Sequence, residues 1–60
     1  MNSQENIKQQ IINKMIRLNV NSNIIEEMEE QFVFMSLQKK EDIFNNWIYS
    51  DFVFWHEESL

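Results

Sequence analysis

The sequence predicts an all-α fold, a small helical hairpin followed by an aromatic-rich helix, and three observations carry this prediction. The 60 residues include neither glycine nor proline, so the tight turns of small β-proteins lack their usual residues. Apolar residues recur at helical spacing through the first half of the chain. A short asparagine-rich segment separates the first two periodic stretches. The length allows one small domain, residues 1–60.

The first helix is expected over residues 3–18. Its predicted buried stripe consists of residues at helical spacing: Ile7, Ile11, Met15 and Leu18. Lysine and arginine lie late in this segment, where positive charge favours the carboxyl end of a helix dipole. The helix therefore has one apolar face that needs a neighbour.

The second helix is expected over residues 23–37, after a connection at 19–23. Three asparagines and a serine fill this connection, and asparagine tolerates the left-handed conformation that ends helices when glycine is absent. Asn23 is the predicted cap of the second helix. Its predicted seam comprises Ile25, Met28, Phe32 and Met35. Because the connection is short, the two helices should be antiparallel neighbours.

A third helix, rich in aromatic residues, is expected over residues 41–56. Its apolar residues recur at helical spacing. The charged run at 39–42 would either separate it from the second helix or form the exposed middle of one continuous helix, since neither glycine nor proline forces a stop. A strand alternative stays open, because aromatic and β-branched residues favour strands and Phe-Val-Phe occurs at both 32–34 and 52–54. An isolated two-stranded ribbon would, however, be weak.

The C-terminal segment holds more bulky apolar side chains than three inward-facing seams can cover. Six of the eight aromatic residues lie between positions 44 and 55. Exposing several of them would forfeit stability and create an aggregation-prone patch. We therefore expect a homo-oligomer or a protein partner to cover the following interface: Phe44, Trp47, Ile48, Phe52 and Trp55. The alternative is that these side chains form the core of a compact monomer.

A cluster of four glutamates on the second helix is a candidate acidic partner-binding face: Glu26, Glu27, Glu29 and Glu30. The cluster could dock on a basic protein or imitate nucleic-acid phosphate, and the alternative is a solvated helix face. The chain has ten acidic and five basic residues, a formal net charge of −5. This is the wrong sign for binding nucleic acid through its phosphates, so we expect no direct nucleic-acid binding.

No pattern in the sequence predicts catalysis. His56 is the only histidine, and the acids that follow it would point apart on a helix, so no metal site is expected. The serines have no predicted base partner except this distant histidine. Lack of glycine removes the phosphate-binding loops, and lack of cysteine removes disulfides and thiolate sites. We expect a protein that is not an enzyme and has no cofactor.

The expected location is the cytoplasm. No apolar run approaches the roughly 18–20 residues of a membrane span, so no membrane association is predicted. The first residues lack the charged and then apolar pattern of a signal peptide. Usage rich in Ile, Asn and Lys and free of Ala is typical of low-GC bacteria and their phages.

Residues 18–37 contain a turn-and-helix pattern made of Leu18-Asn19-Val20-Asn21, Ile24-Ile25-Glu26, Met28-Glu29, Phe32 and Ser36-Leu37. The pattern resembles the turn and second helix of the Sda-type sporulation histidine-kinase inhibitors. That resemblance implies a hairpin fold that binds the dimerisation and phosphotransfer region of a sensor kinase. The chain departs from the family at Val33, Phe34 and Met35, where the family tends to carry basic residues.

These observations predict a small acidic protein that binds a larger protein stoichiometrically and inhibits it. A phage-encoded inhibitor of a bacterial enzyme or defence system is the expected setting. One alternative is a host regulator that inhibits a sensor histidine kinase. Another is a structural or assembly subunit with no inhibitory role.

Overall fold

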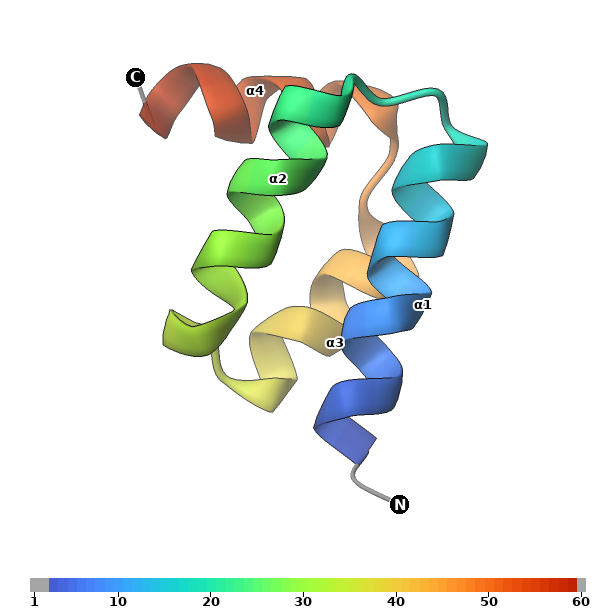
Figure 1. Cartoon of the computed structure of the whole chain (residues 1–60), viewed down its shortest axis with the longest axis vertical. Helices are drawn as coiled ribbons and strands as arrows, with labels where there is room; N and C mark the ends of the chain where they lie inside the picture. The colour runs from blue at the N-terminus through green and yellow to red at the C-terminus, as the bar shows by residue number, and fades with distance from the viewer. Residues whose placement is uncertain (1–2, 60) are drawn as a thin grey trace.

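Residues 3–59 form four α-helices and one short 3₁₀-helix in a computed structural model, which describes the backbone over this range and the side chains of residues 6–59. In chain order the elements are α1 (Ser3–Arg17), α2 (Ser22–Gln31), η1 (Phe32–Phe34), α3 (Leu37–Asn46) and α4 (Tyr49–Ser59). The all-α prediction is confirmed. The helices α1 and α2 run in opposite directions, and α4 lies across the end at which they are connected (Figure 1).

Asn19 ends α1 in the left-handed conformation that the asparagine-rich connection predicts, with φ at 61°. The Asn19 N–H donates to the Ile16 carbonyl at 3.0 Å, and the Val20 N–H donates to the Met15 carbonyl at 3.0 Å. These two bonds satisfy carbonyls that the helix end would leave unpaired. Val20 is buried, as is Met15, so the chain turns back directly over the core.

The start of α2 differs from the prediction. Asn21 is the residue that precedes the helix, and its side chain makes no capping bond. Its backbone carbonyl instead accepts from the N–H groups of Ile24, at 3.0 Å, and Ile25, at 3.2 Å. The prediction of Asn23 as the cap is therefore wrong. The earlier start places Ile24 in the first turn of the helix, where its side chain is buried.

The second helix also ends earlier than the predicted range 23–37, because a serine inside that range begins the next helix. The Ser36 hydroxyl oxygen accepts from the Lys39 N–H at 3.1 Å, which caps the first turn of α3. Met35 is extended between η1 and this cap. The third helix consequently begins at Leu37 and not at position 41.

The predicted single helix over 41–56 is two helices. Trp47 is extended, and α4 begins where the Asp51 carboxylate accepts from the Ile48 N–H at 2.8 Å. A straight helix over 41–56 would be about 24 Å long at 1.5 Å per residue. The molecule measures 32 × 22 × 19 Å, so such a helix would fit only along its longest axis. The break at Trp47 lets α3 pack against α1 and α4 pack against α2.

The strand alternative does not hold within the described residues. The first Phe-Val-Phe run, 32–34, forms η1, and the second, 52–54, lies inside α4. No strand occurs in residues 3–59. The two runs therefore share a sequence but not a structural role.

One hydrophobic core joins all four helices. Its buried members are Ile7, Ile11, Met15, Val20, Ile24, Met28, Phe32, Ile43 and Phe52. The predicted stripe of the first helix is confirmed at three of its positions, and its fourth, Leu18, packs partly buried against the core. Burying one large apolar side chain contributes about 1.5–3 kcal/mol. Lys40 is also buried.

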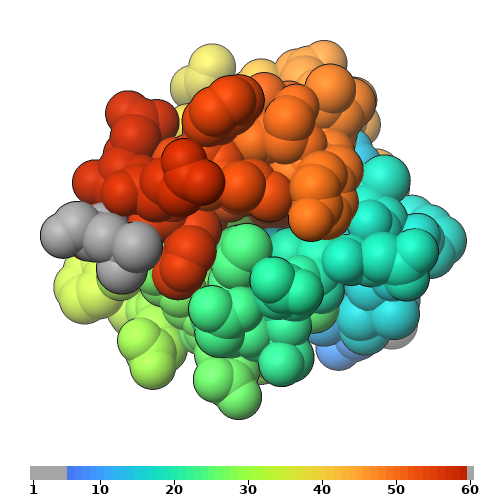
Figure 2. Space-filling view, turned by 90° about the horizontal axis from the view of Figure 1, so that it is seen from above, coloured from blue at the N-terminus to red at the C-terminus, as the bar shows by residue number. Residues whose placement is uncertain are grey.

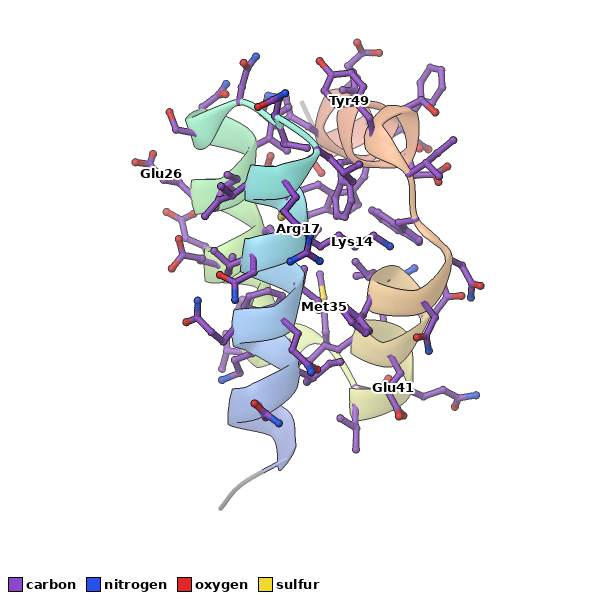
Figure 3. The ribbon with its side chains drawn as sticks, turned by 90° about the vertical axis from the view of Figure 1, so that its right-hand side faces the viewer. Lys14, Arg17, Glu26, Met35, Glu41 and Tyr49 are labelled. Carbon is purple, nitrogen blue, oxygen red and sulfur yellow. The ribbon has the colours of Figure 1, made fainter. Side chains whose placement is uncertain are left out.

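Lys14 connects α1 to the end of α3. Its Nζ donates to the Phe44 carbonyl at 2.6 Å and to the Ile43 carbonyl at 3.4 Å, near the carboxyl end of α3. The ammonium also lies 5.9 Å from the centre of the Phe44 ring. A cation at this position complements the negative end of the α3 dipole. Figure 3 shows Lys14 pointing from α1 toward the chain that follows α3.

The helices are short. The longest, α1, has 15 residues and extends about 22 Å at 1.5 Å per residue. Within residues 3–59, none combines the length and the apolar character needed to cross a lipid bilayer.

Candidate protein-interaction surface

Four of the five predicted interface residues pack inside the chain itself. Phe52 has an exposed fraction of 0% and lies in the core. Phe44, Trp47 and Trp55 are partly buried against that core. The Trp47 ring meets the Phe52 ring at 5.1 Å between centroids and the Trp55 ring at 6.5 Å, both edge to face. Phe52 therefore offers no surface to a second chain, which corrects its place in the predicted interface.

The fifth predicted interface residue, Ile48, is 62% exposed and belongs to a different set of large apolar side chains. The exposed members among the described residues are Ile16, Val33, Phe34, Ile48, Tyr49 and Phe54. Three of them lie at or within α4, and the others lie on α1 and η1. The chain thus has an apolar surplus, as predicted, but much of it is outside the aromatic segment.

The predicted acidic face divides into two parts. Glu26, Glu29 and Glu30 are exposed, and Figure 3 shows Glu26 pointing outward on the side of the molecule opposite α3. Glu27 is partly buried and forms an ion pair through its Oε2 with Nδ1 of His56. Figure 2 shows α4 lying against the beginning of α2, where this pair joins the two helices. Three of the four glutamates therefore remain available to a partner.

A groove lies between α1 on one side and α2 and η1 on the other. It is lined by Lys8, Gln9, Ile12, Glu29, Phe32 and Val33, and these six residues define the hairpin groove. Its volume is about 300 Å³. Of its apolar lining residues, Phe32 is buried and Val33 is highly exposed. Sequence reasoning missed this groove because its two sides are more than 15 positions apart in the chain and meet only through the hairpin.

The two edges of the hairpin groove differ in charge. On the α2 side, Glu29 lies in the lining, and Glu26 and Glu30 are exposed on the same helix. On the α1 side, the polar lining residues that the structure describes are Lys8 and Gln9, a cation and an amide. Among the described residues, the accessible lining of the groove is therefore more polar than apolar, with an acid on one side only.

The histidine has a structural position. His56 joins α4 to α2 through Glu27, and no serine hydroxyl is bonded to it among the described residues. Ser36 caps α3, and the Ser59 hydroxyl donates to the Trp55 carbonyl at 3.0 Å. Within the described part of the chain, no group of histidine and carboxylate side chains has the arrangement of a metal site.

No family model, no curated protein and no solved structure matches this chain. The resemblance of residues 18–37 to the kinase inhibitors stays a prediction from the sequence pattern. Function is therefore inferred from the surface geometry and the charge distribution of the chain itself.

Proposed function

We propose that this protein is a non-catalytic, acidic inhibitor that binds a larger protein stoichiometrically through the hairpin groove and the exposed η1 residues beside it. The observation that carries the proposal is the exposure of Val33 and Phe34, at 76% and 80%. They are neighbours on η1, and Val33 also lines the groove.

The exposure of Phe34 has a cost that a partner would remove. A phenylalanine left in water forgoes most of the stabilisation that its burial would contribute, about 1.5–3 kcal/mol. The 3₁₀-helix η1 is held between α2 and the extended Met35, so the aromatic ring is presented from a helical corner. Aromatic side chains presented in this way are common anchors of protein interfaces, because little conformational entropy is lost when they bind.

Inhibition is the proposed outcome because the described residues include no group of side chains arranged as a metal site, and the exposed apolar side chains instead offer a surface for binding. A standard interface buries about 800 Å² of each partner, a substantial fraction of the 4204 Å² total surface. Bound in this way, the chain would block access to an active site or an assembly surface of its partner. The net charge of −5 favours a partner whose site is basic.

The test is an affinity capture from a low-GC bacterial lysate, followed by titration of the captured protein's activity. We expect the wild-type chain to capture one protein. The control variant Phe54→Ser, which removes a different exposed ring on α4, should capture the same protein. Phe34→Ser should lose most of this capture. The activity of the purified partner should fall linearly and reach its minimum at one equivalent of the wild-type chain.

Several outcomes would contradict the proposal. Equal capture by Phe34→Ser and the wild type would remove the η1 surface from the interaction. Unchanged partner activity at saturation would favour the assembly-subunit alternative. The identity of the partner separates the two inhibitor settings, since a nuclease or helicase fits a phage inhibitor and a sensor kinase fits the host regulator.

A further inference from the structure

We infer that the occupant of the hairpin groove is an amphipathic helix of the partner protein that carries arginine or lysine along one edge. This inference rests on the proposed function, because it names the segment of the partner that the groove would bind.

The helical shape follows from the walls of the groove. The groove lies between α1 on one side and the end of α2 with η1 on the other, and the ridge of a third helix can lie between two such antiparallel segments. Apolar side chains occur along this side of the hairpin, with Ile12 and Val33 in the lining and Ile16 exposed one turn beyond Ile12. An apolar stripe on an incoming helix would cover all three.

The basic edge follows from the charges beside the groove. Glu26, Glu29 and Glu30 are exposed, and none of them forms an ion pair with a described residue. Glu29 and Glu30 lie three and four positions after Glu26, so the three share one face of α2. Two basic side chains one turn apart on an incoming helix would match this spacing. On the opposite edge, the described lining residues are Lys8 and Gln9, and neither of them would attract a basic side chain.

A second copy of the chain fits this surface less well. Each copy would bring a net charge of −5 to an edge that is already acidic. On α1, Lys14 is committed to the carbonyls at the end of α3, and Arg17 does not line the groove. Lys8 alone does not balance the three exposed glutamates of each copy. Charge complementarity therefore favours a basic partner helix, and self-association becomes a competing result of the experiment.

The experiment uses two synthetic helical peptides of about 18 residues, long enough to form helix on binding. Both carry a leucine stripe, and they differ at two positions one turn apart on one edge, which are arginine in the first peptide and glutamate in the second. Binding to the full chain is measured by fluorescence anisotropy at low salt. We expect the wild type to bind the arginine peptide at least about tenfold more tightly than the glutamate peptide.

Charge reversal provides the decisive comparison. The triple variant Glu26→Lys, Glu29→Lys, Glu30→Lys should reverse the preference between the peptides. A control variant with the same change in charge at exposed positions away from the groove, Glu41→Lys, Glu57→Lys, Glu58→Lys, should keep the wild-type preference. Far-ultraviolet circular dichroism checks that both variants remain helical. If the triple variant does not fold, Glu29→Lys alone replaces it and should weaken the preference.

The inference is overturned if neither peptide binds, if the wild type shows no preference, or if the control variant loses the preference as fully as the triple variant. It is also overturned if sedimentation shows a dimer that Ile16→Asp dissociates, because a second copy would then occupy the groove. If neither peptide binds but capture of the partner still depends on Phe34, the inference is wrong and the proposed function stands. Peptide binding without inhibition of a captured partner would contradict the proposed function alone.

Discussion

The N-terminal half of the molecule and its C-terminal half use apolar residues in different ways. In α1 the apolar positions repeat at helical spacing, and the helix buries one stripe against the core. In α4 the apolar residues point in nearly all directions, and only Phe52 is fully buried. The spacing of apolar residues in the sequence is therefore enough to identify the buried face of α1. In α4, which residue is buried depends on contacts with the other helices.

The two halves are also connected by different contacts. Besides the shared core, Lys14 joins α1 to the end of α3, and the Glu27–His56 ion pair joins α2 to α4. Both contacts link positions about 30 residues apart. If the comparison is correct, substitutions in the core should lower the free energy of unfolding most. Loss of the lysine bond to the end of α3 should lower it less, and loss of the ion pair should lower it least.

The largest change in the free energy of unfolding is expected where a buried ring of α4 is removed, and an exposed ring of the same helix provides the comparison. Phe52→Ala should lower the free energy of unfolding by about 3–5 kcal/mol, because it leaves a cavity where a fully buried ring packed. Phe54→Ala, two positions away and 61% exposed, should change it by no more than about 0.5 kcal/mol. Urea denaturation followed by tryptophan fluorescence measures both. Equal losses for the two variants would mean that the Phe54 ring is also covered in solution.

A second prediction concerns the link between α1 and α3. Lys14→Met keeps an unbranched side chain of similar length but removes the donor to the Phe44 and Ile43 carbonyls. We expect a loss of about 1–2 kcal/mol in the free energy of unfolding, since hydrogen bonds from charged donors in partly buried sites have this magnitude. Arg17→Met is the matched control, because Arg17 is exposed at the end of the same helix. An equal effect of the two substitutions would show that only the charge at the end of α1 matters.

The same contrast explains how much of the molecule the sequence could predict. The stripe of α1 and the turn at Asn19 are predictable because both depend on residues close together in the chain. The break between α3 and α4 is not, since isoleucine at position 48 is no capping residue and its partner Asp51 lies three positions later. Ser36 escapes recognition as a cap because no acid follows it at the third position.

The surface is harder to predict than the helices. The glutamates stand out as a cluster in the sequence, but the role of Glu27 depends on His56, which is 29 positions away. The hairpin groove depends on how Lys8 and Glu29 are aligned across two helices. Such an alignment is set by the packing of the whole core and is not written in any local pattern.

The smallest expected effect tests the contact between α2 and α4. Because the Glu27 and His56 side chains are only partly buried, solvent weakens their attraction, and we expect a coupling of about 0.2–1 kcal/mol. A double-mutant cycle with Glu27→Ala, His56→Ala and the double variant, followed by thermal unfolding, isolates this coupling. A coupling near zero would mean that α4 is held by Phe52 and its aromatic neighbours alone. A value well above this range would instead make the ion pair, rather than the core, the contact that selects which side of α4 faces inward.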